Sequence, residues 1–147
     1  MSDGSALLSV DDFSVTFTQG GQSSLCVDRI SFDIKPRETV ALVGESGSGK
    51  SVTALSVMRL LPYPAASHPT GTIRFKGKEM LTMPEREMRR IRGNDITIIF
   101  QEPMTSLNPL HTIERQIGEI LSLHKGLSGE PARKRILELL TQVGIPD

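Results

Sequence analysis

Apolar and polar residues alternate over two stretches near the start of the chain. Apolar side chains recur at near-alternate positions over residues 10–17, and again over residues 25–34 (LCVDRISFDI) after the pair Gly20 and Gly21. Period-two alternation is typical of strands with one buried face, and paired glycines are common in tight turns. The pattern predicts two antiparallel strands joined by a hairpin.

Three further segments have the composition of strands. The run ETVALVG, residues 38–44, is continuously apolar up to its closing glycine, and ITIIF, residues 96–100, is rich in β-branched residues. Continuous apolar runs are typical of strands buried on both faces of a parallel sheet. The segment GTIRFKGKEM, residues 71–80, predicts another strand with a glycine turn.

Helical periodicity predicts four helices. The first runs from about residue 50 to 61 and ends before two prolines, and the second is a short charged helix over residues 84–93. Two more follow toward the end of the chain. The apolar stripes are Ala54, Leu55, Met58 and Leu61 in the first helix, Ile113, Ile117, Ile120 and Leu121 in the third, and Ile136, Leu139, Leu140 and Val143 in the fourth.

Composition narrows the class of protein. The 147 residues carry 37% hydrophobic and 23% charged residues, which is ordinary for a globular domain, and Lys+Arg balance Asp+Glu at 17 each. A neutral chain has no basic field to attract nucleic acid, so no nucleic-acid partner is expected. The lone Cys26 suits a reducing cytoplasm and is expected to be a small buried side chain. The sequence shows no pattern of a targeting peptide and no run of roughly 20 apolar residues that could span a membrane. Any function at a membrane is therefore expected to depend on a partner protein.

One motif carries recognisable chemistry. Gly44, Gly49, Lys50 and Ser51 match G-x-x-x-x-G-K-[ST], between a predicted strand and a predicted helix. Glycines let backbone amides surround phosphates, the helix N-terminus favours negative charge, and a lysine and a hydroxyl suit phosphate and Mg²⁺. The alternative is a glycine-rich turn that merely caps the helix. The expected nucleotide-binding residues are Gly44, Glu45, Ser46, Gly47, Ser48, Gly49, Lys50, Ser51 and Val52.

The surroundings of this loop resemble one family. A long antiparallel β pattern precedes it, and IIFQEPMTSLNPLHTI, residues 98–113, follows. Together with GESGSGKS and RRIRGNDI, these segments resemble the nucleotide-binding subunit of ABC transporters, in the subfamily that powers import of dipeptides, oligopeptides and nickel. The resemblance implies an α/β P-loop NTPase fold, with a RecA-like core and an antiparallel β subdomain, truncated within the helical subdomain.

The resemblance also implies residue roles. Lys50 and Gln101 would be catalytic, Ser51 and Gln101 would contact Mg²⁺, and residues 101–109 would lie near the coupling helix of a membrane permease. A glutamine suits this place because its neutral amide can orient a ligand without adding charge. Phe17 matches the family's adenine-stacking aromatic, and a flat apolar ring can stack on a base. Because Phe17 shares a predicted strand face with Phe13, core packing is the alternative.

Several family elements are absent from the sequence. An LSGGQ-type signature, a strand ending in Asp-Glu and a later switch histidine are not found. LSGE, residues 127–130, has Glu130 and Pro131 at positions where the signature needs glycine and glutamine, so we interpret it as a helix cap. In ITIIFQE, Gln101 stands where a carboxylate should be, and Glu102 is not expected to be the catalytic base. Residues 1–147 are therefore expected to be the N-terminal part of a nucleotide-binding domain.

These observations predict an ATP-binding subunit that couples ATP hydrolysis to import of peptides or related solutes. Its expected partners are ATP with Mg²⁺, permease subunits and a second nucleotide-binding domain, at the cytoplasmic face of a bacterial inner membrane. This chain is expected to bind Mg·ATP without turnover. Two alternatives stay open: a soluble P-loop kinase or repair ATPase, and a nucleotide-binding module without catalysis. His68, His111 and His124 lack metal-ligand spacing and are expected to be structural or surface residues.

Overall fold

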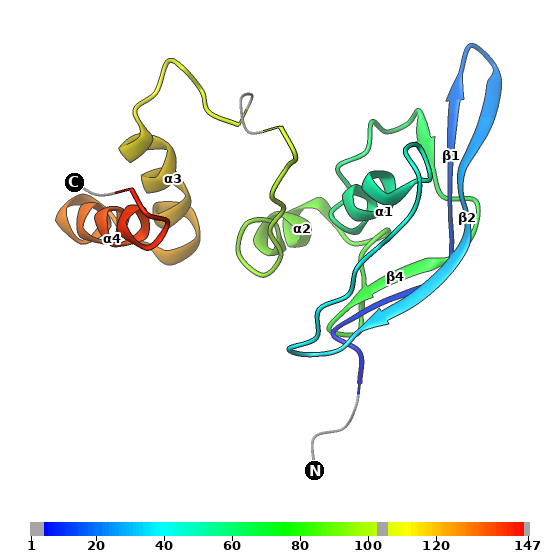
Figure 1. Cartoon of the computed structure of the whole chain (residues 1–147), viewed down its shortest axis with the longest axis horizontal. Helices are drawn as coiled ribbons and strands as arrows, with labels where there is room; N and C mark the ends of the chain where they lie inside the picture. The colour runs from blue at the N-terminus through cyan, green and yellow to red at the C-terminus, as the bar shows by residue number, and fades with distance from the viewer. Residues whose placement is uncertain (1–4, 103–105, 146–147) are drawn as a thin grey trace. The chain divides into compact units, whose positions relative to one another are not determined.

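The computed structural model describes residues 5–102 and 106–145 of the chain. The chain divides into two compact units, residues 1–88 and 89–147, because contacts are denser within each unit than between them. The first unit contains the antiparallel sheet and the glycine-rich loop, and the second contains two longer helices (Figure 1).

A long β-hairpin dominates the first unit, as the alternating pattern predicts. Strand β1 (Leu8–Gln19) pairs antiparallel with β2 (Gln22–Ile34), and Figure 1 shows the two strands side by side over their length. Gly20 and Gly21 have φ angles of 58° and 81°. Two consecutive positive φ angles fit the tight turn that closes a hairpin, and glycine adopts them without steric cost.

Irregularities in β1 break the simple alternation of its side chains. Phe13, Ser14 and Val15 are all buried in succession, and the pairing register with β2 shifts on both sides of Phe13 and after Val15. The buried Ser14 hydroxyl accepts hydrogen bonds from the Arg29 amide at 3.0 Å and from Thr70 Oγ1 at 2.8 Å. These bonds satisfy a polar group that burial would otherwise destabilise.

Three short strands complete the sheet on the other side of β1. Strand β4 (Thr72–Phe75) pairs with one end of β1 and with β5 (Lys78–Glu79), and β3 (Ala66–Ser67) pairs with the other end. The strand order is β2-β1-β4-β5. The buried hydrophobic residues of this unit are Val10, Phe13, Val15, Val27, Val57, Met58, Leu61, Ala66, Ile73, Phe75, Met80, Met83 and Met88.

Two helices accompany the sheet. Helix α1 (Lys50–Val57) is shorter than predicted, with Met58 as its C-cap residue, and it buries Thr53, Ser56 and Val57. Of the predicted stripe, Met58 and Leu61 are buried beyond the helix, Leu55 is half-buried, and Ala54 is exposed. Helix α2 (Glu85–Ile91) forms as the charged segment predicts. Glu85, in its first turn, lies 3.4 Å from the Arg59 guanidinium just beyond α1, so the ion pair links the ends of the two helices.

The second unit contains the two predicted later helices. Thr112 caps α3 (Ile113–Lys125) by accepting a hydrogen bond from the Arg115 amide, and α4 (Gly129–Gln142) follows after a short turn. The core between these helices consists of Leu121, Ala132 and Ile136. Among the described residues, no helix has both the length and the apolar character needed to cross a membrane.

The prediction of two buried parallel strands is wrong for this structure. Residues 39–44 and 97–100 are not strands, and their side chains are largely exposed, with 92% exposure at Val43 and 98% at Ile99. A strand forms only where a neighbour accepts and donates its backbone hydrogen bonds. Neither segment has such a neighbour among residues 5–102 and 106–145, where Ile96 forms only an isolated bridge with Arg92.

Candidate functional site

The glycine-rich loop of the first unit closes around one ammonium group. Lys50 Nζ donates hydrogen bonds to the carbonyl oxygen of Gly44 at 2.8 Å, that of Glu45 at 2.6 Å, and Ser48 Oγ at 3.2 Å. These three acceptors use all three ammonium protons. The loop therefore holds a full positive charge beside its own backbone, at a partly exposed position that a solvent-borne anion can reach.

Gly44 and Gly47 favour the closed form of this loop for different reasons. Gly47 has a φ angle of 81°, which strongly favours glycine. At Gly44 a Cβ atom would lie 2.6 Å from Ser48 Oγ, and that hydroxyl is one of the three acceptors of Lys50. A side chain at either position would therefore disturb the loop that surrounds the ammonium group.

The N-terminus of α1 begins where the loop ends. Gly49 is the N-cap residue, and its carbonyl oxygen accepts hydrogen bonds at 2.8 Å from both the amide and the hydroxyl of Thr53. The amides of residues 50–52 have no intrahelical acceptor, because the first helical bond runs from the Thr53 amide to the Gly49 carbonyl oxygen, so they carry the positive end of the helix dipole. Ser51 is exposed in this first turn. The arrangement has the donors that a phosphate requires.

A hollow of about 250 Å³ lies over the loop, and strand β2 forms one of its walls. The strand packs closely on Gly49, where an added Cβ atom would lie 2.8 Å from Val27 Cγ2 and 2.9 Å from the Cys26 carbonyl oxygen. The sequence predicts that Cys26 is buried, but in the structure it is only part-buried. The lining residues are Cys26, Val27, Asp28, Ile30, Leu42, Val43, Gly44, Ser48, Gly49, Lys50 and Thr53.

Of the loop residues predicted to bind nucleotide, Gly44, Ser48, Gly49 and Lys50 line this hollow, and its β2 wall and Thr53 were not predicted. The predicted residues that do not line it are Glu45, Ser46, Gly47, Ser51 and Val52. The motif spans consecutive positions, so its residues are recognisable from local sequence alone. Cys26 and Val27 come from a strand that precedes the loop, and no local pattern connects them to it. Thr53 does leave a signal, because a threonine hydroxyl can bond the carbonyl four residues earlier in a helix, here that of Gly49.

Phe17 and Gln101, whose roles the resemblance implies, also lie outside this hollow. Phe17 is part-buried in β1, where it pairs with Ser24 and Ala66, and it does not line the hollow. Gln101 is exposed in the second unit. Within the expected permease-facing segment, residues 103–105 fall outside the described residues and residues 106–109 are exposed. The roles of Phe17, Gln101 and this segment stay predictions.

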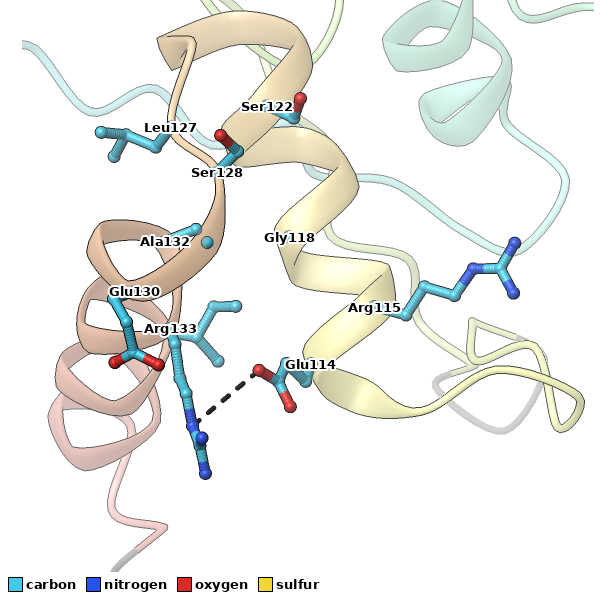
Figure 2. Close-up of a pocket in the computed structure, with 11 residues that line it drawn as sticks. Glu114, Arg115, Gly118, Ser122, Leu127, Ser128, Glu130, Ala132 and Arg133 are labelled. Atoms are coloured by element: carbon cyan, nitrogen blue, oxygen red, sulfur yellow. Dashed lines mark ion pairs between the residues drawn. The ribbon is translucent and has the colours of Figure 1, made fainter.

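A larger hollow of about 550 Å³ lies between α3 and α4 in the second unit (Figure 2). Its walls include residues 127–130, the LSGE segment, and Ser128 is the N-cap of α4 with Pro131 in the first turn, as the cap interpretation predicts. Figure 2 shows Glu114 and Arg133 directed toward one another across the hollow, 4.0 Å apart. Both side chains are well exposed, so this ion pair contributes little stability.

The sequence matches one family model and many curated proteins. The family model described as "ABC transporter" matches residues 27–147. The chain is 72% identical over 139 residues to the "Peptidoglycan transport ATP-binding protein YejF" of Agrobacterium fabrum, which covers 95% of the chain and 26% of that protein. It is 50% identical over 141 residues to the "Dipeptide transport ATP-binding protein DppD" of Bacillus subtilis, covering 96% of the chain and 42% of that protein.

The chain also resembles solved structures of ATP-binding cassettes. A dimeric structure of "a post-hydrolysis state of the ATP-binding cassette MJ0796 bound to ADP and Pi" superposes with a TM-score of 0.77 at 26% identity. The match covers 91% of this chain and 56% of that one. The fold class, an α/β P-loop NTPase, agrees with the prediction. The chain spans about a quarter to two-fifths of the length of the curated relatives described above.

Proposed function

The chain belongs to the ABC transporter family, and from this premise we propose that it supplies the phosphate-binding part of an ATP site in an ATP-binding subunit. The observation that carries the proposal is the closed loop around Lys50 Nζ at the N-terminus of α1. Loop, ammonium group and free helix amides together make a site for a polyphosphate. In such chemistry the protein acts mainly by positioning and electrostatic stabilisation.

The donor set fits Mg·ATP. The loop backbone and the amides of residues 50–52 would hold the phosphates, and Lys50 would exchange its bonds to the loop carbonyls for bonds to phosphate oxygens. The exposed Ser51 hydroxyl offers the kind of oxygen ligand that Mg²⁺ prefers, and we assign it and Gln101 to the metal. When bound, Mg²⁺ would neutralise part of the phosphate charge. Phe17 remains our candidate for stacking on the adenine ring.

We further propose that the whole protein powers a peptide importer. Support comes from the names of its relatives, which describe peptidoglycan and dipeptide transport, and from the dimeric cassette with which the fold superposes. In this proposal a second nucleotide-binding domain completes each ATP site, and permease subunits dock near residues 101–109. The protein would then lie peripherally at the cytoplasmic face of a bacterial inner membrane.

Removal of the Lys50 ammonium group tests ATP binding. Lys50→Ala should weaken Mg·ATP binding about tenfold or more, because a hydrogen bond to a charged group contributes about 1.5–3 kcal/mol. Isothermal titration calorimetry measures the dissociation constant. Lys78→Ala, which removes the same charge from an exposed position on β5, is the matched control and should bind as the parent does. Equal affinity of the Lys50→Ala and parent proteins would refute the site.

Turnover is a separate question from binding. We propose that residues 1–147 alone bind Mg·ATP but do not hydrolyse it at steady state, because the sequence contains neither the signature nor the Asp-Glu carboxylate. A phosphate-release assay on this chain should give no rate above that of Lys50→Ala. A Lys50-dependent rate would contradict this part of the proposal and leave nucleotide binding intact.

A further inference from the structure

Thr53 bonds the residue that ends the loop. Its amide and its hydroxyl both donate to the Gly49 carbonyl oxygen at 2.8 Å, and the side chain is only 3% exposed. The hydrogen bond from the Thr53 amide is the ordinary first backbone hydrogen bond of helix α1. The hydroxyl bond is additional, so the orientation of the Gly49 carbonyl is fixed by two donors from one residue.

The carbonyl of Gly49 and the amide of Lys50 belong to the same peptide group. A trans peptide is planar, and its C=O and N–H bonds point in opposite directions. When Thr53 holds the carbonyl along the helix, the Lys50 N–H must point out of the helix N-terminus, toward the loop. This amide is one of the donors that have no intrahelical acceptor.

Strand β2 restrains the other side of the same residue. Gly49 has a φ angle of 89°, and an added Cβ atom would meet both Val27 and the Cys26 carbonyl oxygen. The peptide between Gly49 and Lys50 therefore lies between a strand that leaves no room for a side chain and a hydroxyl that bonds its oxygen. Small rotations of this peptide would move the Lys50 amide and the start of the lysine side chain together.

We propose that Thr53 is a positioning residue of the phosphate site. It orients the Gly49–Lys50 peptide so that the Lys50 amide faces the phosphates, and it does not itself touch the nucleotide. The inference rests on the proposed function, because it names a residue that prepares the same site. A hydroxyl bonded to the carbonyl four residues earlier is common in helices, so the test must separate positioning from helix stability.

Helix α1 contains a matched control. Ser56 lies one turn after Thr53, is fully buried, and donates to the Val52 carbonyl oxygen at 2.7 Å. It makes the same kind of bond in the same helix but acts on a carbonyl inside the helix rather than on the loop. Loss of its hydroxyl should lower stability without changing phosphate binding.

The experiment measures dissociation constants of Mg·ATP and Mg·tripolyphosphate, together with the thermal midpoint, in the intact protein. Thr53→Val should weaken both ligands about 3- to 10-fold, the range that corresponds to one neutral hydrogen bond. Thr53→Ser restores the hydroxyl and should bind within about twofold of the parent. Ser56→Ala should also bind within about twofold, whatever its midpoint.

The outcomes distinguish this inference from the proposed function. If Thr53→Val binds as the parent does while Lys50→Ala loses binding, the positioning role is wrong and the phosphate site stands. Equal weakening by Ser56→Ala would reduce the effect to helix stability. If Thr53→Ser, which keeps the hydroxyl, weakened binding as much as Thr53→Val, the shape of the side chain rather than its hydrogen bond to Gly49 would determine the affinity, and the positioning role would be wrong. If Lys50→Ala binds as the parent does, the proposed function itself fails.

Discussion

At the scale of single residues, His68 shows how a half-buried hydrogen-bond network selects the tautomer of a neutral histidine. Its Nδ1 atom lies 3.3 Å from the Ser14 carbonyl oxygen, and its Nε2 atom lies 2.6 Å from Tyr63 Oη. A carbonyl can only accept, so Nδ1 must carry the proton, and neutral Nε2 then accepts from the tyrosine hydroxyl. The ring also contacts Phe13, with the centroids 5.1 Å apart. His68 is thus a structural residue, as predicted.

This environment makes stability depend on pH. Burial lowers the pKa of His68 below its usual 6.5, although its hydrogen bond to the Ser14 backbone acts in the opposite direction. Below pH 6.5 the unfolded chain binds the proton more readily than the folded chain, so stability is complete above that pH and falls as the pH decreases through the folded-state pKa. We expect the free energy of unfolding to be lower at pH 5.5 than at pH 7.5.

Urea denaturation at the two pH values measures this effect. Tyr63 is the only tyrosine and the chain has no tryptophan, so intrinsic fluorescence reports on the surroundings of His68. His68→Gln should reduce the difference in unfolding free energy between the two pH values. His124→Gln, on α3, leaves His68 in place and should keep the difference. An unchanged difference in His68→Gln would assign the pH effect to other groups.

At the scale of elements, the sheet depends on a close approach at Gly71. An added Cβ atom there would lie 2.5 Å from the Asp12 carbonyl oxygen and closer still to Phe13 Cα, at a φ angle of 88°. Gly71→Ala should destabilise the protein by at least about 2 kcal/mol, because the backbone of β1 cannot move aside cheaply. The change in urea midpoint measures this cost.

Gly77 provides the matched substitution for Gly71. It has a φ angle of 77° in the turn between β4 and β5, but an added Cβ atom would meet nothing within 4 Å. Gly77→Ala should therefore cost only about 1 kcal/mol, the ordinary cost of a left-handed residue. If the two substitutions have equal effects, the backbone angle rather than the contact with β1 determines the cost at Gly71.

The elements also show what the sequence could and could not predict. The β1–β2 hairpin and the helices have local signals, namely alternation, glycine turns and helical stripes, and all of them form, although α1 is shorter than predicted and β1 is irregular around Phe13. The apolar runs over residues 38–44 and 96–100 indicate that these side chains would favour burial. They do not indicate a neighbouring strand, which each run would need in order to form a strand itself. The loop motif around Lys50 was predictable because its residues are consecutive, whereas its wall of Cys26 and Val27 depends on the packing of β2 against the loop, which local sequence does not encode.

At the scale of the whole molecule, the two units differ in the size of their cores. The buried hydrophobic residues of the first unit come from β1, β2, β3, β4, α1, α2 and the segments that adjoin them. In the second unit, within the described part of the chain, only Leu121, Ala132 and Ile136 are buried to this degree. Because stability scales with buried apolar area, the α3–α4 pair should open at lower free energy than the hairpin.

Hydrogen exchange followed by mass spectrometry separates the two units. Ile136 is 4% exposed, so Ile136→Ala should cost about 3 kcal/mol through lost burial and a residual cavity. Its neighbour Leu137 is 43% exposed, so Leu137→Ala should change protection little. We expect Ile136→Ala to abolish protection over residues 113–142 and to leave residues 8–34 protected as in the parent. Equal loss over both ranges would mean that the chain opens as one cooperative body, because a local cavity could then reach the hairpin only through global unfolding.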